Sequence, residues 1–144
     1  MIKLEKVTKE NYWEVVNLSV SPSQEDYVVS NAISIGQSKV QDECIPVAIY
    51  KENLLIGFAM YCIDTDDDQY WIYRIMIDQK YQSKGFGKEA FGILLQKIKA
   101  DKTKNVIYLG VHRKSEVAVC LYESYGFAFE GQVFGDEHIM CLRY

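Results

Sequence analysis

One stretch of the chain has the composition of an anion-binding loop: Gln82-Ser83-Lys84-Gly85-Phe86-Gly87-Lys88. It lies between a predicted strand that ends at Ile77 and a predicted helix that starts near Gly87, so its backbone N–H groups meet the positive end of the helix dipole. The two glycines allow a phosphate to approach the backbone without a Cβ in the way, and the two lysines add positive charge. The spacing matches neither the dinucleotide fingerprint G-x-G-x-x-G nor the P-loop G-x-x-x-x-G-K-S/T. For this stretch alone, a plain strand-to-helix turn is the alternative.

A second stretch carries a tyrosine inside a predicted helix: Ala118-Val119-Cys120-Leu121-Tyr122-Glu123-Ser124-Tyr125-Gly126-Phe127. Ser115 is the expected N-cap of this helix. A phenol ordinarily titrates near pH ~10, so Tyr122 is protonated at neutral pH and is able to donate a proton. The alternative is that Tyr122 only packs in the core, which is the usual fate of a helix tyrosine.

Together the two stretches resemble the Gcn5-related (GNAT) acetyltransferases. The first is similar to the family motif Q/R-x-x-G-x-G/A and the second to A-x-x-L-Y-x-x-x-G-F, in the family's order and on the expected elements. A narrower resemblance to bacterial spermine/spermidine acetyltransferases lies in the segments Val20–Tyr27, Pro46–Tyr50 and Leu55–Tyr61. The element order also matches, so the resemblance covers essentially the whole chain.

The resemblance implies an N-acetyltransferase that moves the acetyl group of acetyl-CoA onto a primary amine by direct attack through a tetrahedral intermediate. A polyamine such as spermine or spermidine is the expected acceptor. Two alternatives remain open: another acceptor amine (an amino acid, an antibiotic, or a protein N-terminus or lysine), and a protein that binds acetyl-CoA without turnover. A homodimer is expected on the same ground.

The resemblance also assigns roles to residues. Tyr122 is the expected general acid for the departing thiolate, and a backbone N–H near Ile75 to Ile77 is the expected oxyanion donor. The expected acetyl-CoA contacts are Ile75, Met76, Ile77, Gln82, Ser83, Lys84, Gly85, Phe86, Gly87, Lys88, Tyr108, Leu109, Gly110, Ser115 and Tyr122. The expected acceptor contacts are Glu25, Asp26, Tyr27 and Tyr73.

The chain departs from the family at two positions. Ser115 stands where the family usually has asparagine, and serine is still expected to cap the helix. Tyr73 stands where polyamine acetyltransferases often carry an acidic residue, and Tyr73-Arg74 offers no base at neutral pH. The residue that deprotonates the acceptor is therefore not assigned, and a water chain or a backbone carbonyl is the expected route.

For three further sets of side chains, a structural role is favoured over a functional one. The aspartates of the segment Asp64–Asp68 are able to attract a polycation, but a charge run in a hairpin loop is usually only solvated. His112 is expected to be a solvated strand-end residue. Cys120 is expected to be a core residue, because no histidine lies near it in the sequence to activate its thiol.

The composition sets the remaining expectations. The 144 residues carry 20 acidic and 16 basic side chains, and a net charge of -4 argues against a nucleic-acid partner. No apolar run reaches membrane-spanning length, and Met1–Lys6 lacks the apolar core of a signal peptide. Four cysteines without close spacing predict buried, reduced thiols in a cytoplasmic protein, and two histidines are too few for a metal site.

The order of the predicted helices and strands indicates an α/β fold that forms one domain over residues 1–144. Helices are expected to flank both faces of a mixed, mostly antiparallel sheet of about seven strands. Predicted strands lie at Ile2–Lys6, Ile45–Tyr50, Leu54–Ile63, Tyr70–Ile77, Val106–Val111, Phe127–Phe134 and Glu137–Leu142. Predicted helices begin at Thr8, at Ser21–Ser23, at Gly87 and at Ser115.

Overall fold

A seven-stranded sheet forms the centre of the computed structural model, which describes residues 1–144. Along the sheet the strands are ordered β1-β2-β3-β4-β5-β7-β6, and only β4 and β5 run parallel. The strands are β1 (Ile2–Lys6), β2 (Ile45–Lys51), β3 (Leu54–Ile63), β4 (Tyr70–Ile77), β5 (Val106–His112), β6 (Ala128–Phe134) and β7 (Glu137–Arg143). The helices are α1 (Tyr12–Asn17), α2 (Asn31–Val40), α3 (Phe86–Lys99), α4 (Glu116–Ser124) and the 3₁₀ helices η1 (Pro22–Tyr27) and η2 (Gln79–Tyr81).

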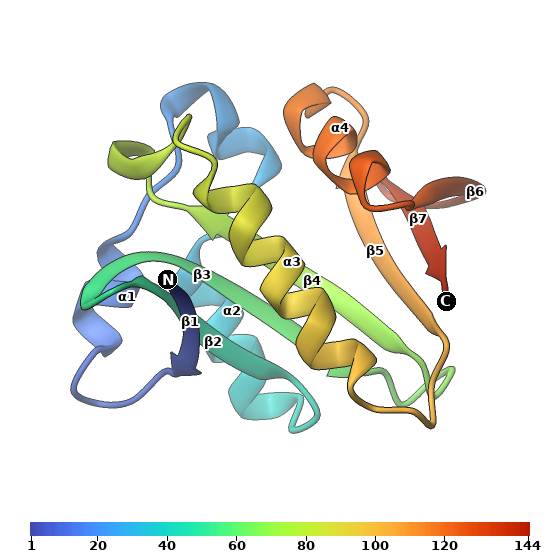
Figure 1. Cartoon of the computed structure of the whole chain (residues 1–144), viewed down its shortest axis with the longest axis horizontal. Coiled ribbons are helices and arrows are strands. Elements are labelled where there is room, and N and C mark those ends of the chain that lie inside the picture. Colours follow the sequence, from blue (N-terminus) through green and yellow to red (C-terminus); the bar gives the residue numbers. More distant parts are fainter.

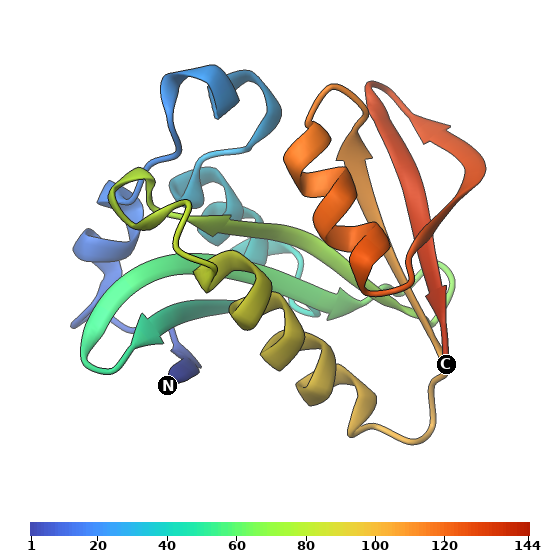
Figure 2. The ribbon, with the colours of Figure 1, turned by 45° about the horizontal axis from the view of Figure 1, so that its top comes forward.

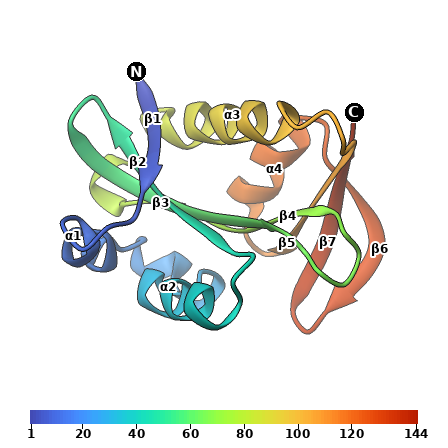
Figure 3. The same cartoon turned by 90° about the horizontal axis from the view of Figure 1, so that it is seen from below.

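Helices cover both faces of the sheet, which confirms the predicted fold class (Figures 1 and 3). Helices α3 and α4 lie on one face, and α1 and α2 lie on the other. The central strand β3 is buried on both sides, so its sequence is continuously apolar and does not alternate between apolar and polar residues. Two cores result: a larger one under α3 and α4, built around Phe91 and Leu94, and a smaller one under α1 and α2, built around Val15 and Phe58.

Two helix starts near the N-terminus differ from the prediction. Thr8 does not cap α1, because the Thr8 N–H donates to Asn11 Oδ1 (2.8 Å) and the helix begins only after Asn11. The single helix expected from Ser21–Ser23 onward is divided into η1 and α2. Extended backbone at Val28 ends η1, and the Ser30 hydroxyl accepts a hydrogen bond from the Ile33 N–H and starts α2 anew.

The cysteines also depart from expectation at one position. Cys44, Cys62 and Cys141 are buried, whereas Cys120 is exposed, because it lies on the outer side of α4. Burial raises the pKa of the Cys62 thiol to about 12, so that thiol is protonated at neutral pH. None of the helices has the length and hydrophobicity that a membrane crossing requires.

We expect Gly57→Ala to destabilise the fold and Gly36→Ala to stabilise it. Gly57 pairs with Ile77, and a Cβ at position 57 would clash with the Met76 backbone carbonyl oxygen, so β3 and β4 would have to separate. The expected loss is about 1–3 kcal/mol of unfolding free energy. Gly36 lies in α2, and a Cβ added there would have nothing within 4 Å, so alanine is expected to add about 0.5–1 kcal/mol. Urea unfolding of both variants measures the two changes, and equal shifts would contradict the assigned strand contact.

Candidate active site

The parallel strands β4 and β5 pair at only three positions before they separate. The pairs are Tyr70–Ile107, Trp71–Tyr108 and Ile72–Leu109, whereas the pairing of β4 with β3 continues to Ile77. The two strands diverge beyond the last pair (Figures 1 and 2). From residue 73 to residue 77, β4 therefore has a free edge toward β5, with backbone groups that an extended ligand is able to pair with. This edge contains three of the predicted coenzyme contacts: Ile75, Met76 and Ile77.

A β-bulge at Tyr73 marks the point where the strands separate. Ile72 pairs with Tyr61 and Arg74 pairs with Met60, so Tyr73 is an extra residue in β4. The bulge changes which residues face which side. Ile72, Ile75 and Ile77 pack under α3, and the consecutive residues Tyr73 and Arg74 both line a cavity on the opposite face.

The predicted anion-binding loop leads from the end of β4 into α3 and has its backbone donors free. Ser83 (φ 62°) and Gly85 (φ 83°) are in the left-handed region, and Gly85 is the N-cap of α3. The N–H groups of residues 83 to 88 have no acceptor within the protein. A Cβ at position 85 would have nothing within 4 Å, so the space over the loop is open. The loop thus presents a cluster of unused N–H donors at a helix N-terminus.

The Gln82 side chain holds this loop in place. Its Nε2 donates to the Ile77 carbonyl oxygen (2.9 Å) and to Gln24 Oε1 of η1 (3.0 Å). At the other end of the loop, the hydroxyl of Tyr125, the C-cap residue of α4, donates to the Lys88 carbonyl oxygen (2.7 Å). Gln82 therefore positions the loop between β4 and η1, and Tyr125 ties the first turn of α3 to α4.

Tyr122 lies on the α3 side of the sheet with a buried ring and an unused hydroxyl. The residue is 9% exposed, and its ring packs against Phe91 (5.0 Å between centroids) and Phe127 (6.3 Å). Its hydroxyl has no hydrogen-bond partner in the protein, yet it is not among the fully enclosed unpaired polar atoms, so it reaches solvent. Burial, and secondarily the negative charge of Glu137, raise the pKa of Tyr122 to about 12. The phenol is therefore protonated, and its proton is free to be donated.

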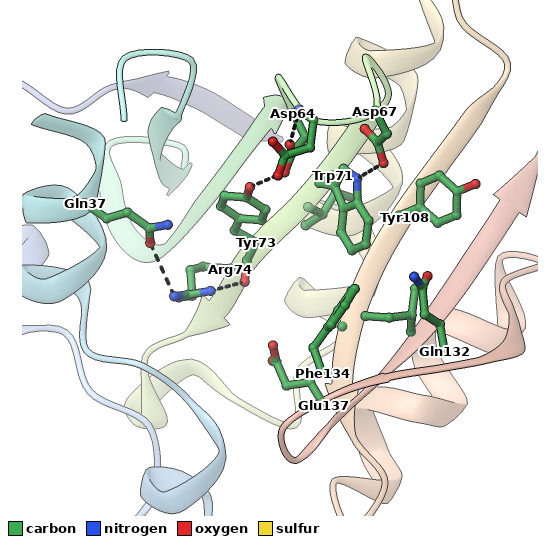
Figure 4. A pocket seen from close by; sticks show the side chains of 14 residues that line it. Gln37, Asp64, Asp67, Trp71, Tyr73, Arg74, Tyr108, Gln132, Phe134 and Glu137 are labelled. Carbon is green, nitrogen blue, oxygen red and sulfur yellow. Dashed lines mark hydrogen bonds between the residues drawn. The ribbon is translucent and has the colours of Figure 1, made fainter. Parts of the chain in front are cut away.

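A cavity of about 560 Å³ lies on the α2 side of the sheet, over the point where β4 and β5 separate. Its walls are acidic and aromatic (Figure 4). Arg74 is its only basic residue. Its acidic residues are Asp64, Asp66, Asp67 and Glu137, and its aromatic residues are Trp71, Tyr73, Tyr108 and Phe134.

Hydrogen bonds from aromatic side chains fix two of the aspartates in the cavity wall. Asp64 Oδ2 accepts from the Tyr73 hydroxyl (2.7 Å), and Asp67 Oδ2 accepts from Trp71 Nε1 (2.8 Å). Trp71 in turn stacks on Tyr108 of β5, with 4.9 Å between ring centroids. Asp68 points elsewhere and forms an ion pair with Lys104 (2.7 Å). The segment Asp64–Asp68 is thus more than a solvated charge run, because three of its four carboxylates line the cavity.

The two residues at the bulge differ in what they offer the cavity. Burial, and then the hydrogen bond to Asp64, raise the pKa of the Tyr73 phenol, so this side chain is a donor and not a base. Arg74 donates from Nη1 to the Tyr73 carbonyl oxygen (2.8 Å) and from Nη2 to Gln37 Oε1 of α2 (3.4 Å). Its Nε is buried without a partner, and no carboxylate pairs with it.

Three of the four predicted acceptor contacts lie outside this cavity. Of the predicted set only Tyr73 lines it. Glu25 lines a separate cavity of about 340 Å³ between α1, η1 and Met76, and Asp26 is exposed on η1. The Tyr27 ring packs against the imidazole of His112 (4.6 Å between centroids), so His112 is not the fully solvated strand-end residue that the sequence favours.

The remaining predicted coenzyme contacts lie on β5 and at the start of α4. Tyr108 and Gly110 face the cavity, whereas Leu109 is buried in the core under α3. Ser115 is at the N-cap position of α4, but its hydroxyl makes no capping hydrogen bond, so the expected serine cap is wrong.

Sequence reasoning missed several residues of the cavity. Trp71 is the in-register partner of Tyr108. Side chains alternate between the two faces along each strand, and this alternation could have indicated that the two aromatic residues share a face. Glu137, Gln132 and Phe134 gave no such signal, because they come from the β6–β7 hairpin and reach the site only through the strand order β5-β7-β6.

Comparison with known proteins gives matches over most of the chain. Residues 10–127 match the model of the Acetyltransferase (GNAT) family. The chain is 32% identical over 146 residues to the spermine/spermidine N(1)-acetyltransferase of Bacillus subtilis strain 168, with 96% of both chains covered.

Solved structures show the same fold at lower identity. The spermidine N-acetyltransferase of Vibrio cholerae in complex with CoA and spermine has a TM-score of 0.74 at 18% identity, covering 98% of this chain and 93% of that one. An aminoglycoside acetyltransferase in complex with ribostamycin and coenzyme A has a TM-score of 0.81 at 15% identity, covering 99% and 93%.

Proposed function

Because this chain belongs to the acetyltransferase (GNAT) family, whose members take the acetyl group from acetyl-CoA, we propose that its acceptor is a primary amine of a polyamine. The observation that carries this proposal is the acidic and aromatic cavity at the point where β4 and β5 separate. The named activity of the relative from Bacillus subtilis supports the same acceptor class.

The free edge of β4 and the loop before α3 suit the two ends of the coenzyme. The pantetheine arm carries amide groups that are able to pair with the backbone of residues 73 to 77 as an added strand would. The pyrophosphate then falls at the unused N–H groups of residues 83 to 88, where the α3 dipole favours negative charge. This placement brings the thioester to the point of separation, between the cavity and Tyr122.

The cavity has the charge pattern that an extended polycation requires. Asp64 and Asp67 lie at one end and Glu137 lies at the other, with Trp71, Tyr108 and Phe134 between them (Figure 4). A polyamine has the complementary pattern, because its ammonium groups are separated by methylene segments. Carboxylates bind the ammonium groups, and the aromatic rings contact the methylenes and add cation–π attraction. A monoamine has no second charge for the far end.

Tyr122 is the proposed general acid on the other side of the strands. As the tetrahedral intermediate collapses, the C–S bond breaks and the sulfur takes the phenolic proton. The raised pKa of Tyr122 keeps that proton in place over the whole physiological range. The hydroxyl has no competing partner in the protein, so its hydrogen bond is available to the sulfur.

We expect Gly85→Ala to weaken acetyl-CoA binding by about tenfold or more, equivalent to ~1.4 kcal/mol, because the new methyl group occupies the open space over the loop. Alanine at a φ of +83° also costs stability, so a matched control is needed. Gly131→Ala has the same strain, since Gly131 has a φ of +94° and nothing within 4 Å. Calorimetric titration should show a loss of affinity in the first variant only. Equal affinities would remove the loop from the coenzyme site.

We expect Tyr122→Phe to lower kcat by ~10²-fold or more while leaving acetyl-CoA affinity unchanged, since the proton is needed only as the thioester breaks. Phenylalanine keeps the contacts with Phe91 and Phe127, and the lost hydroxyl has no partner in the protein, so the melting temperature should hardly move. Steady-state thiol release and thermal unfolding measure both. Wild-type kcat in this variant would make Tyr122 a packing residue.

The acceptor class is tested by thiol release with spermine, spermidine, a monoamine, an amino acid and an aminoglycoside. We expect kcat/KM to be highest for the polyamines and to fall with salt, because exposed charges are screened over ~10 Å at 0.1 M. Asp67→Asn keeps an acceptor for Trp71 Nε1 but removes a cavity charge, so it should raise the KM for spermine severalfold and barely change that for a monoamine. Asp68→Asn removes the same charge outside the cavity and is the control. Equal effects of the two variants, or a higher kcat/KM for the amino acid or the aminoglycoside, would reject a polyamine site.

A further inference from the structure

Transfer to an amine requires a group that removes a proton from the incoming ammonium, and β4 does not supply one. At the bulge, Tyr73 is engaged as a donor to Asp64, and Arg74 is a cation. A side chain that acts as the base must therefore come from another element of the cavity. Of the four acidic residues in its wall, Asp64 and Asp67 are held by aromatic donors, and Asp66 belongs to the same loop, where its N–H donates to Asp64 Oδ1. Glu137 comes from the β6–β7 hairpin and lies at the other end of the cavity (Figure 4).

The Glu137 carboxylate lies directly over the backbone of Gly110. A Cβ at position 110 would stand 3.1 Å from Glu137 Oε1, so only glycine at this position leaves the present space for the carboxylate. Gly110 is the first residue of β5 beyond its last pair with β4. The carboxylate thus lies at the start of the opening, and it takes part in no ion pair of the protein.

We propose that Glu137 is the general base that deprotonates the acceptor amine. This assignment rests on the proposed acetyl transfer to an amine and adds the residue that starts it. Glu137 and Tyr122 then lie on opposite faces of β5, one toward the cavity and the other toward the α3 core. They are close enough for the charge of Glu137 to affect the Tyr122 phenol.

The proton and bond changes balance with these two residues and solvent water. The ammonium gives one proton to the Glu137 carboxylate, and the neutral nitrogen forms a bond to the thioester carbonyl carbon. When the C–S bond breaks, the sulfur takes the Tyr122 proton, and the second nitrogen proton returns to the Tyr122 oxygen through solvent. The products are the amide and coenzyme A thiol. The proton on Glu137 leaves to bulk water through the exposed side of the hairpin.

Other charged or titratable groups face the same space and contribute to any pH dependence. On β4 and the preceding loop these are Tyr73, Arg74, Asp64, Asp66 and Asp67. On β5 they are Tyr108 and His112, which is the register partner of Glu137. Tyr122 lies on the opposite face of β5, but the charge of Glu137 acts on its phenol. The test must therefore distinguish the loss of a base at position 137 from the loss of one negative charge near the cavity.

Glu137→Gln is expected to lower kcat/KM for spermidine by ~10²-fold or more at pH 7, with unchanged acetyl-CoA affinity. The deficit should shrink about tenfold for each pH unit up to the titration range of an alkylamine near ~10.4, because solution then supplies the neutral amine. On an acceptor amine that is already neutral at pH 7, the variant should nearly match the wild type. Asp136→Asn removes the same charge one residue away, outside the cavity, and should leave the pH profile unchanged.

Glu137→Asp distinguishes proton transfer from simple attraction. It keeps the charge but withdraws the carboxylate by one methylene, so a base should lose much of its rate and an attracting charge should lose little. A deficit in Glu137→Gln that is independent of pH, or that appears only in the KM for spermidine, would overturn the assignment. Wild-type turnover on the amine panel is measured first. Its absence would overturn the proposed acetyl transfer itself, whereas turnover that survives Glu137→Gln at pH 7 would overturn only the role of Glu137.

Discussion

The limited pairing of β4 with β5 is the constraint on which the site depends. A parallel pair that continued to Ile77 would satisfy every backbone group of β4 and would leave no edge for a ligand. The pairing stops after Ile72, immediately before the bulge residue Tyr73, because the extra residue changes the direction of β4 relative to β5. The same bulge directs Tyr73 and Arg74 into the cavity together. One inserted residue thus creates both the opening and part of its lining.

The two faces of the sheet present different chemical groups at the opening. The α3 face provides the loop of free N–H groups and the buried Tyr122, so it suits an anion and a leaving thiolate. The α2 face provides carboxylates and aromatic rings, so it suits a cation. In the proposed function, the coenzyme and the cationic acceptor therefore approach from opposite sides and meet at the opening in the sheet. Successive residues of β5 face opposite sides of the sheet, so that Leu109 packs in the core while Gly110 faces the cavity.

Local sequence patterns predicted the fold and the glycine-bearing loop before α3, because their causes are local. The apolar spacing of α3 and the glycines at its start are properties of one segment. The acceptor cavity depends on long-range register. Nothing near Tyr73 shows that Met60 and Tyr61 oppose its neighbours and leave it unpaired. Likewise, adjacent aspartates differ only because Asp67 meets Trp71 and Asp68 meets Lys104. Glu137 arrives through β7, which is inserted between β5 and β6.

The three pairs between β4 and β5 also bear on the cooperativity of folding. They join a half formed by β1 to β4 to a half formed by β5 to β7, and the contacts of Phe91 with Tyr122 and Phe127 add a second connection through α3. In the proposed binding mode, the coenzyme pairs with the free edge of β4 and places its thioester beside Tyr122, so it contacts both halves and binds only when both are folded. At a concentration 100 times its Kd, such a ligand adds about 2.7 kcal/mol to the free energy of unfolding. In this binding mode, acetyl-CoA stabilises the fold of the enzyme that consumes it, in addition to serving as its cosubstrate.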